Sequence, residues 1–274
     1  MPYALSLFDI TTFLALGAAA GFLAGLLGIG GGLIVVAALV WLLPAQGIPE
    51  PVLMQVALAT ALAGIVFTSM SSTRAHWRRG GIRWPLVAWL APGLVLGGLA
   101  GAVLATWLPG WLLAAFVSVY CLLSAAQLAW GRSRPATTHV HDVGRALLAA
   151  AGLVIGAVSA VVGIGGGSMT VPLLVWRGVL PVQAVATSAA CGVVIALASV
   201  TGYVFSPHEP SVALPPGTWG YVQLPAALTI AAASVLTAPL GARLAHHLPP
   251  QRLRQVFAVF LLVIAAMMAI AALR

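Results

Sequence analysis

Two clusters of glycine are the strongest chemical signal in the sequence. Residues 28–32 read GIGGG inside a long apolar run, and residues 163–167 read GIGGG again. Each glycine inside a helix costs about 1 kcal/mol relative to alanine, so consecutive glycines break helices. They also leave their N–H groups uncovered, and such groups bind anions where a helix begins. The duplicated motif therefore predicts two helix breaks whose exposed amides can bind an anion.

The residues after the second cluster predict where the next helix starts. Ser168 suits an N-cap, and Pro172 then falls in the first turn, where its missing N–H removes no intrahelical bond. We expect a helix to begin at Ser168 with its positive end towards the membrane interior. The alternative is that the glycines only allow close helix packing, as Gly21/Gly25 and Gly97/Gly101 are expected to do. Packing requires no consecutive glycines, so we favour a substrate site.

Small hydroxyl side chains add to these candidates. Thr60 and Thr187 occupy equivalent positions in two similar stretches, ALATALAG at 57–64 and AVATSAAC at 184–191. Hydroxyls in apolar helices also bond the carbonyls of their own helix, so a structural role remains open. The residues themselves thus give these candidates for substrate binding: Gly30, Gly31, Gly32, Thr60, Gly165, Gly166, Gly167, Ser168, Thr187 and Ser188.

The composition is that of an all-α polytopic membrane protein. Hydrophobic residues make up 62% of the 274, charged residues 6%, and the mean hydropathy is +1.10. No soluble domain hides so much apolar surface behind so few charges. The net charge of +8 is expected to orient the protein in the lipid bilayer rather than to bind nucleic acid.

The positions of the acidic residues bear on the substrate. The four acidic residues are Asp9, Glu50, Asp142 and Glu209, and none of them lies in the middle of an apolar segment. A cation transporter or proton pump usually has an acidic residue there, as a ligand or proton relay. A site lined by backbone N–H groups and hydroxyls, without acids, suits a small anionic substrate.

The chain contains an internal repeat. The two GIGGG motifs, the stretches around Thr60 and Thr187, and GAVLATWLP at 101–109 with GARLAHHLP at 241–249 recur in the same order. The first repeat covers 1–130, a polar linker covers 131–143, and the second repeat covers 144–274. Each repeat has four apolar segments, at 11–43, 52–73, 84–107 and 111–130 and at 144–176, 179–205, 219–244 and 253–273. A helix that crosses the bilayer needs about 20 residues, so the first segment of each repeat is too long for a single crossing.

The positions of the arginines distinguish between two topologies. If each glycine-containing segment were one straight span, the arginines would divide between the two sides. If each segment instead turns back at GIGGG, each repeat has a hairpin and three crossings, and the second repeat is inverted. Every one of the twelve basic residues except Arg274 then lies on one side. The positive-inside rule favours two inverted repeats, with the linker and the arginine-rich loops cytoplasmic.

At this point the residues resemble a known family. The duplicated G-x-G-G-G hairpin, the A-T/S segment after it and RAHWRRGGIRW at 74–84 look like the sulfite exporter TauE/SafE family over nearly the whole chain. The resemblance implies a multi-pass protein of the bacterial inner (plasma) membrane that moves sulfite, sulfonates and related anions outwards. It adds Gly28 and Gly163 to the candidate residues. One departure is that the family's proline after the motif, Pro172 here, has Ala37 as its first-half counterpart.

We therefore expect an exporter of sulfite or an organosulfonate that works by alternating access around the two GIGGG turns. Two alternatives remain: a non-transporting membrane subunit that acts through a partner chain, and a metal or cation carrier that uses HVHD at 139–142. No nucleophile–base pair indicates an enzyme, and no cofactor or bound metal is expected. The sequence leaves the oligomeric state open.

Overall fold

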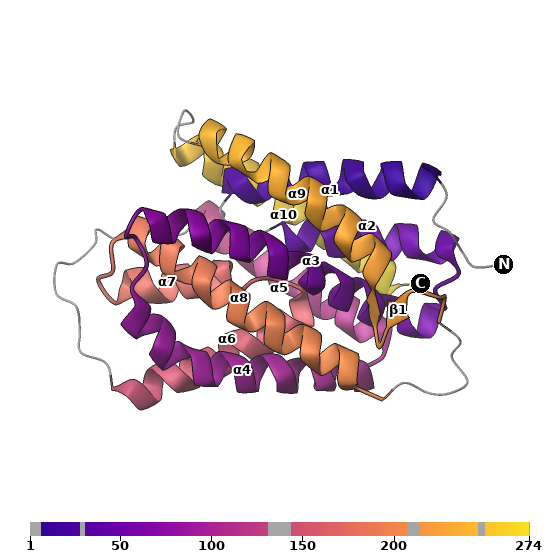
Figure 1. The fold of residues 1–274 in the computed structure, drawn as a ribbon, viewed down its shortest axis with the longest axis horizontal. Helices are drawn as coiled ribbons and strands as arrows, with labels where there is room; N and C mark the ends of the chain where they lie inside the picture. The colour runs from indigo at the N-terminus through magenta and orange to yellow at the C-terminus, as the bar shows by residue number, and fades with distance from the viewer. Residues whose placement is uncertain (1–6, 28–30, 131–143, 208–213, 246–249, 274) are drawn as a thin grey trace.

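Helices make up almost all of the structure. The computed structural model describes residues 7–27, 31–130, 144–207, 214–245 and 250–273 (Figure 1). Eight helices in these residues are long and apolar enough to cross a membrane, and two shorter apolar helices, α2 and α7, are not. The all-α polytopic class predicted from composition is confirmed.

The helices of the first half follow the predicted apolar segments, except that the first segment is divided into two helices. They are α1 (Leu7–Leu27), α2 (Gly32–Leu42), the 3-10 turn η1 (Leu43–Gln46), α3 (Glu50–Arg78), α4 (Trp84–Trp107) and α5 (Gly110–Trp130). The segment predicted at 11–43 is thus two helices, and the chain between them contains the first glycine cluster. Helix α3 runs beyond the predicted 52–73 to Arg78 and is followed by Gly80, whose φ is +66°.

The second half has the same order of helices and one added feature. Its elements are α6 (Arg145–Val162), α7 (Gly167–Trp176), α8 (Pro181–Phe205), β1 (Thr218–Trp219), β2 (Val222–Gln223), α9 (Leu224–Ala245) and α10 (Pro250–Ala272). The segment predicted as helix from 219 begins instead with a small antiparallel ribbon, because Gly217 and Gly220 have positive φ and turn the chain. Helix α9 therefore starts only at Leu224.

Helices from one half pack against helices from the other. Helix α1 lies along α9, α4 lies along α6, and α5 lies against α10. Helices α3 and α8 contact each other and are the two most buried of the eight long helices. The helices that exchange partners hold corresponding places in the two halves. The inverted relation between the repeats stays a prediction.

Glycines set the spacing of the outer helix pairs. A β-carbon at Gly97 would lie 2.1 Å from the carbonyl oxygen of Leu153, and one at Gly101 would lie 2.5 Å from that of Ala157. Across the α1–α9 pair, a β-carbon at Gly21 would lie 2.3 Å from the carbonyl oxygen of Ser234. Such backbone contact is the packing role expected for glycines spaced four residues apart.

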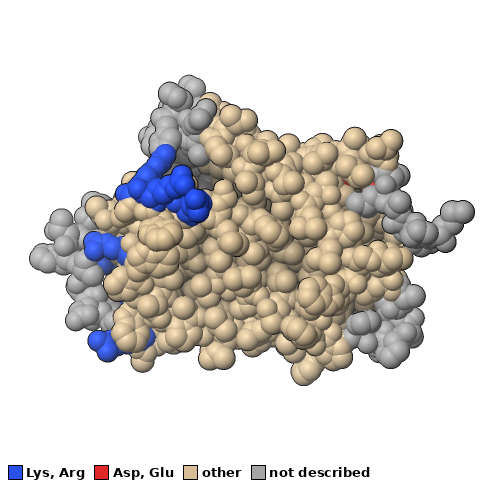
Figure 2. All heavy atoms as spheres, viewed as in Figure 1, with Lys and Arg blue, Asp and Glu red and all other residues tan. Residues whose placement is uncertain are grey.

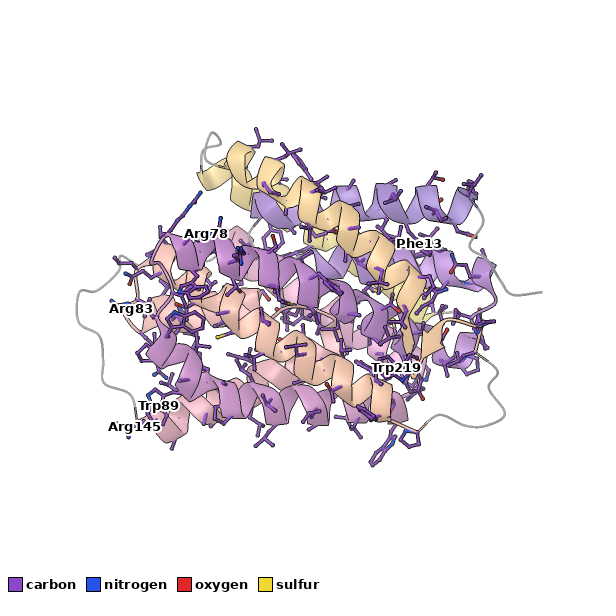
Figure 3. The ribbon with its side chains drawn as sticks, viewed as in Figure 1. Phe13, Arg78, Arg83, Trp89, Arg145 and Trp219 are labelled. Carbon is purple, nitrogen blue, oxygen red and sulfur yellow. The ribbon has the colours of Figure 1, made fainter. Side chains whose placement is uncertain are left out.

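Positive charge gathers at one end of the bundle. Figure 2 shows the described arginine side chains on this face at its left end. Arg78, Arg83 and Arg145 are labelled there in Figure 3, whereas Trp219 of the ribbon lies at the other end. The short helices α2 and α7 lie towards opposite ends (Figure 1). The described arginines seen on this face therefore lie at one end of the long axis of the bundle.

Candidate functional site

The two glycine clusters meet inside the bundle. A β-carbon at Gly32 would lie 2.3 Å from the carbonyl oxygen of Gly163, and one at Gly163 would lie 2.5 Å from Cγ2 of Val36. Contact this close requires glycine on both sides. Gly28 and Gly30 of the predicted site lie outside the described residues. Gly31 is the N-cap of α2, as Gly166 is of α7.

The start of α7 differs by one residue from the sequence prediction. The helix begins at Gly167 and its N-cap is Gly166, whose φ of +72° is the left-handed conformation that glycine adopts without strain. The prediction that Ser168 caps the helix was wrong. Ser168 is the second helical residue, and its hydroxyl shares a hydrogen bond with the Tyr120 hydroxyl of α5. Pro172 consequently lies in the second turn, where its missing N–H removes the bond to the Ser168 carbonyl.

Four consecutive amides at this turn have no partner among the described residues. No described residue accepts a hydrogen bond from the N–H groups of Gly165, Gly166, Gly167 or Ser168. The three glycines are buried. Buried N–H groups without a partner are rare in proteins, and a helix N-terminus adds positive potential to them. Chemically, these amides form a cluster of hydrogen-bond donors, and their binding of an anion stays a prediction.

Helices α3 and α8 flank the second glycine cluster, residues 163–167, with residues that the sequence did not single out. A β-carbon at Gly165 would lie 3.2 Å from Cγ2 of Ile65 and 3.7 Å from Oγ of Ser69. One at Gly192 would lie 3.0 Å from both the Gly165 carbonyl oxygen and Ser69 Oγ. Gly192 follows the AVATSAAC stretch directly, so a glycine in the middle of an apolar segment was a usable signal. Nothing in the sequence distinguished Ser69.

The predicted threonines make matching contacts elsewhere. Thr60 Oγ1 accepts a hydrogen bond from the backbone N–H of Gln223 at 3.0 Å, and Thr187 Oγ1 accepts one from that of Arg83 at 3.0 Å. Each threonine thereby holds the residue that precedes α9 or α4. Ser188 donates to the Val185 carbonyl of its own helix at 2.9 Å. The structure gives all three hydroxyls structural partners, and their contact with a substrate stays a prediction.

A hollow lies beside Gly31 and Gly32 at the start of α2. It has a volume of about 20 Å³, which is room for about one water molecule. Gly31, Gly32, Gly64, Thr68 and Ser234 are among the residues that line it. Thr68 Oγ1 bonds carbonyls of its own helix, and Ser234 Oγ donates to the Gly17 carbonyl at 2.8 Å. The hollow is therefore small, and its hydroxyls already have partners.

The structure offers no described metal centre. In the part of the chain that is described, no three His, Cys, Asp or Glu side chains come together in a group that could hold a metal ion. The HVHD stretch at 139–142 lies outside the described residues.

Comparison with known proteins assigns this chain to a family. The family model described as "Sulfite exporter TauE/SafE" matches residues 13–268. A "Probable membrane transporter protein" of Haemophilus influenzae is 38% identical over 261 residues, which cover 92% of this chain and 95% of the relative. Proteins of the same description from Bacillus subtilis and Methanocaldococcus jannaschii are 29% and 24% identical. They match over 78% and 85% of this chain and over 86% and 85% of their own lengths. No solved structure matches the chain.

The family match covers nearly all of the helices described above, including both glycine turns. The relatives in two bacteria and an archaeon match over most of their own lengths as well as most of this one. The chain therefore belongs to the sulfite exporter TauE/SafE family, and it is a membrane transporter rather than an enzyme.

Proposed function

We propose that the chain exports a small sulfur-containing oxyanion, such as sulfite or an organosulfonate, by alternating access around the two GIGGG turns. The observation that carries the proposal is a row of four amides, from Gly165 to Ser168, that have no hydrogen-bond partner in the described part of the chain; three of them belong to buried glycines. An anion supplies acceptors for these groups, and the N-terminus of α7 favours its negative charge. The direct contact between Gly32 and Gly163 supports one central site shared by the two halves.

The charges of the described residues support an anion over a cation. The two acids whose positions are described, Asp9 and Glu50, lie in the first turns of α1 and α3, away from the glycine turns. A cation site inside a membrane usually needs a carboxylate ligand. Arginines at one end of the bundle attract anions towards that end.

The proposal includes an orientation. Cytoplasmic loops of membrane proteins are enriched in arginine, so the arginine-rich end and the 131–143 linker face the cytoplasm of a bacterial inner membrane. Two inverted repeats, 1–130 and 144–274, then bring one hairpin to the centre from each side. Movement of one repeat against the other would expose the site alternately to each side.

The test is anion flux through purified protein in liposomes. Radiolabelled sulfite, an alkylsulfonate and chloride are loaded in turn, and their release is compared with that from protein-free liposomes. The proposal predicts release of sulfite or the sulfonate without release of chloride. Release of none of these anions, with or without a proton gradient, would contradict the proposed substrate class.

A further inference from the structure

We infer that Ser159 and Thr170 donate hydrogen bonds to the oxygens of the bound anion and make the second turn selective for oxyanions over halides. The inference rests on the proposed function and names residues that would select its substrate. Ser159 lies on α6 four residues before Gly163, and Thr170 lies on α7 four residues after Gly166. The two hydroxyl-bearing residues therefore bracket the turn along the chain, one from each helix.

Both hydroxyls are buried without a partner. Ser159 and Thr170 each have 0% exposure, and neither oxygen forms a hydrogen bond with any described residue. Hydroxyls in other helices of the bundle behave differently: Thr229 of α9 and Ser188 of α8 bond the carbonyls of Pro225 and Val185 in their own helices. A buried polar group without a partner loses its hydration and gains nothing in return. The two hydroxyls are therefore free to bind a ligand.

The geometry directs Ser159 towards the unpartnered amides. Its Oγ lies 3.4 Å from the place where a β-carbon of Gly166 would stand, next to the N-cap of α7. Thr170 lies one helical turn further along. The carbonyl of Gly166, which the Thr170 hydroxyl would otherwise bond, already accepts the N–H groups of Met169 and Thr170. Both hydroxyls thus lack the usual partner: Ser159 Oγ lies beside the N-cap of α7, and Thr170 belongs to the first turn of that helix.

The internal repeat shows that these two positions are polar in one half only. In the repeat alignment, Ala24 stands opposite Ser159 and Val35 stands opposite Thr170. Ala24 and Val35 both line the hollow beside the start of α2. In the second half, a β-carbon at Gly166 would lie 2.3 Å from Ile195 Cδ1. The second half combines hydroxyls with a helix start, whereas the first half offers a small, mostly apolar hollow.

The donor count fits an oxyanion. Amide N–H groups and two hydroxyls can donate to separate oxygens of a sulfite or sulfonate group, whereas a halide has no separate oxygens to accept these bonds. A site built to hydrogen-bond particular oxygens rejects a ligand that lacks them, because its own polar groups are then left unpaired.

The experiment measures sulfite release from liposomes at low sulfite concentration, with and without excess chloride. The test variants are Ser159→Ala and Thr170→Val, which take the residues that the first half already carries at these positions. Thr170→Ser keeps the hydroxyl. The matched control is Ser199→Ala, because Ser199 is also fully buried and unpartnered but lies 3.1 Å from the β-carbon position of Gly98 on α4. Melting temperature in detergent reports on folding.

We expect sulfite release to fall about tenfold in each test variant, which is the loss of one hydrogen bond to a charged ligand. We also expect chloride to compete better in these variants, while Thr170→Ser keeps more sulfite release than Thr170→Val and Ser199→Ala behaves as wild type. Unchanged release and unchanged chloride competition in folded Ser159→Ala and Thr170→Val would overturn the inference, and so would an equal loss in Ser199→Ala. No release of sulfite or sulfonate by the wild-type protein would overturn the proposed function itself.

Discussion

At the scale of single residues, left-handed glycines define the second turn. Gly163 ends α6 with φ of +75°, and Gly166 begins α7 with φ of +72°. Any other L-residue is strained in this conformation by about 1–2 kcal/mol. The backbone between these two residues can therefore reverse direction while its amides stay uncovered.

Substitution of Gly166 tests whether space as well as backbone conformation demands glycine. Gly166→Ala adds a methyl group 2.3 Å from Ile195 Cδ1, so we expect it to lower stability by more than backbone strain alone. The control is Gly80→Ala, which shares the positive φ but has open space around it and should lose only about 1 kcal/mol. Thermal unfolding in detergent measures both. Equal losses of melting temperature in the two variants would show that the Ile195 side chain moves aside at no cost in stability, which would contradict the prediction.

Thr60 offers a second test at this scale. Thr60→Val removes the acceptor for the buried Gln223 N–H, and we expect a loss of about 1–3 kcal/mol in stability. Thr201→Val is the control, because the exposed Thr201 hydroxyl only donates to the Leu197 carbonyl of its own helix. Chemical or thermal unfolding distinguishes the two. A Thr60→Val protein as stable as Thr201→Val would mean that Thr60 does not anchor the start of α9.

At the scale of elements, close helix pairs depend on glycine at the crossing. Gly97→Ala would place a methyl group 2.1 Å from the Leu153 carbonyl oxygen, so α4 and α6 must separate. We expect a loss of about 1–3 kcal/mol, as for other overpacked sites. Gly64→Ala is the control, since its nearest neighbour lies 4.0 Å away and alanine favours helix by about 1 kcal/mol. A higher melting temperature for Gly64→Ala than for Gly97→Ala is the predicted order, and the reverse order would contradict this packing.

The elements also show what sequence patterns can predict. The apolar segments and the glycine clusters predicted the long helices and the break between each long and short helix, because composition decides which residues can cross a bilayer. The ribbon at 218–223 was missed, since the apolar run that contains it hides the turn formed by Gly217 and Gly220. The N-cap was misplaced by two residues because Ser168 is a good capping residue, but Tyr120 takes its hydroxyl and Gly166 provides the left-handed cap.

The candidate site was predictable only in part for a related reason. Consecutive glycines are visible in a sequence, and they do meet at Gly32 and Gly163. Ser159 and Thr170 stand out only by their lack of partners, which depends on every neighbour in three dimensions. Thr60 and Thr187 make matching hydrogen bonds, and their backbone partners across the bundle could not be seen from spacing.

At the scale of the whole molecule, the arginine-rich end defines an orientation that can be measured. Glu50 begins α3 and Arg79 follows its other end, so the two residues lie at opposite ends of a helix long enough to span the bilayer. We expect a cysteine in place of Arg79 to react with an impermeant thiol reagent only after the cytoplasmic side is opened. A cysteine in place of Glu50 should react from outside. Labelling of both positions from the same side would contradict the proposed topology.

The central claim is that the glycine turns bind the transported anion, and sulfite flux through Gly165→Ala tests it most directly. Gly165 has no positive φ, and its added methyl group would press only on Ile65 Cγ2 at 3.2 Å, so the fold should survive. The control Gly110→Ala adds a methyl group 3.6 Å from Met54 Cβ, far from the turns in sequence. We predict that Gly110→Ala folds and transports sulfite, whereas Gly165→Ala loses sulfite flux by about tenfold or more, because its methyl group crowds the unpaired amides. Full sulfite flux in a folded Gly165→Ala protein would contradict a substrate site at these turns.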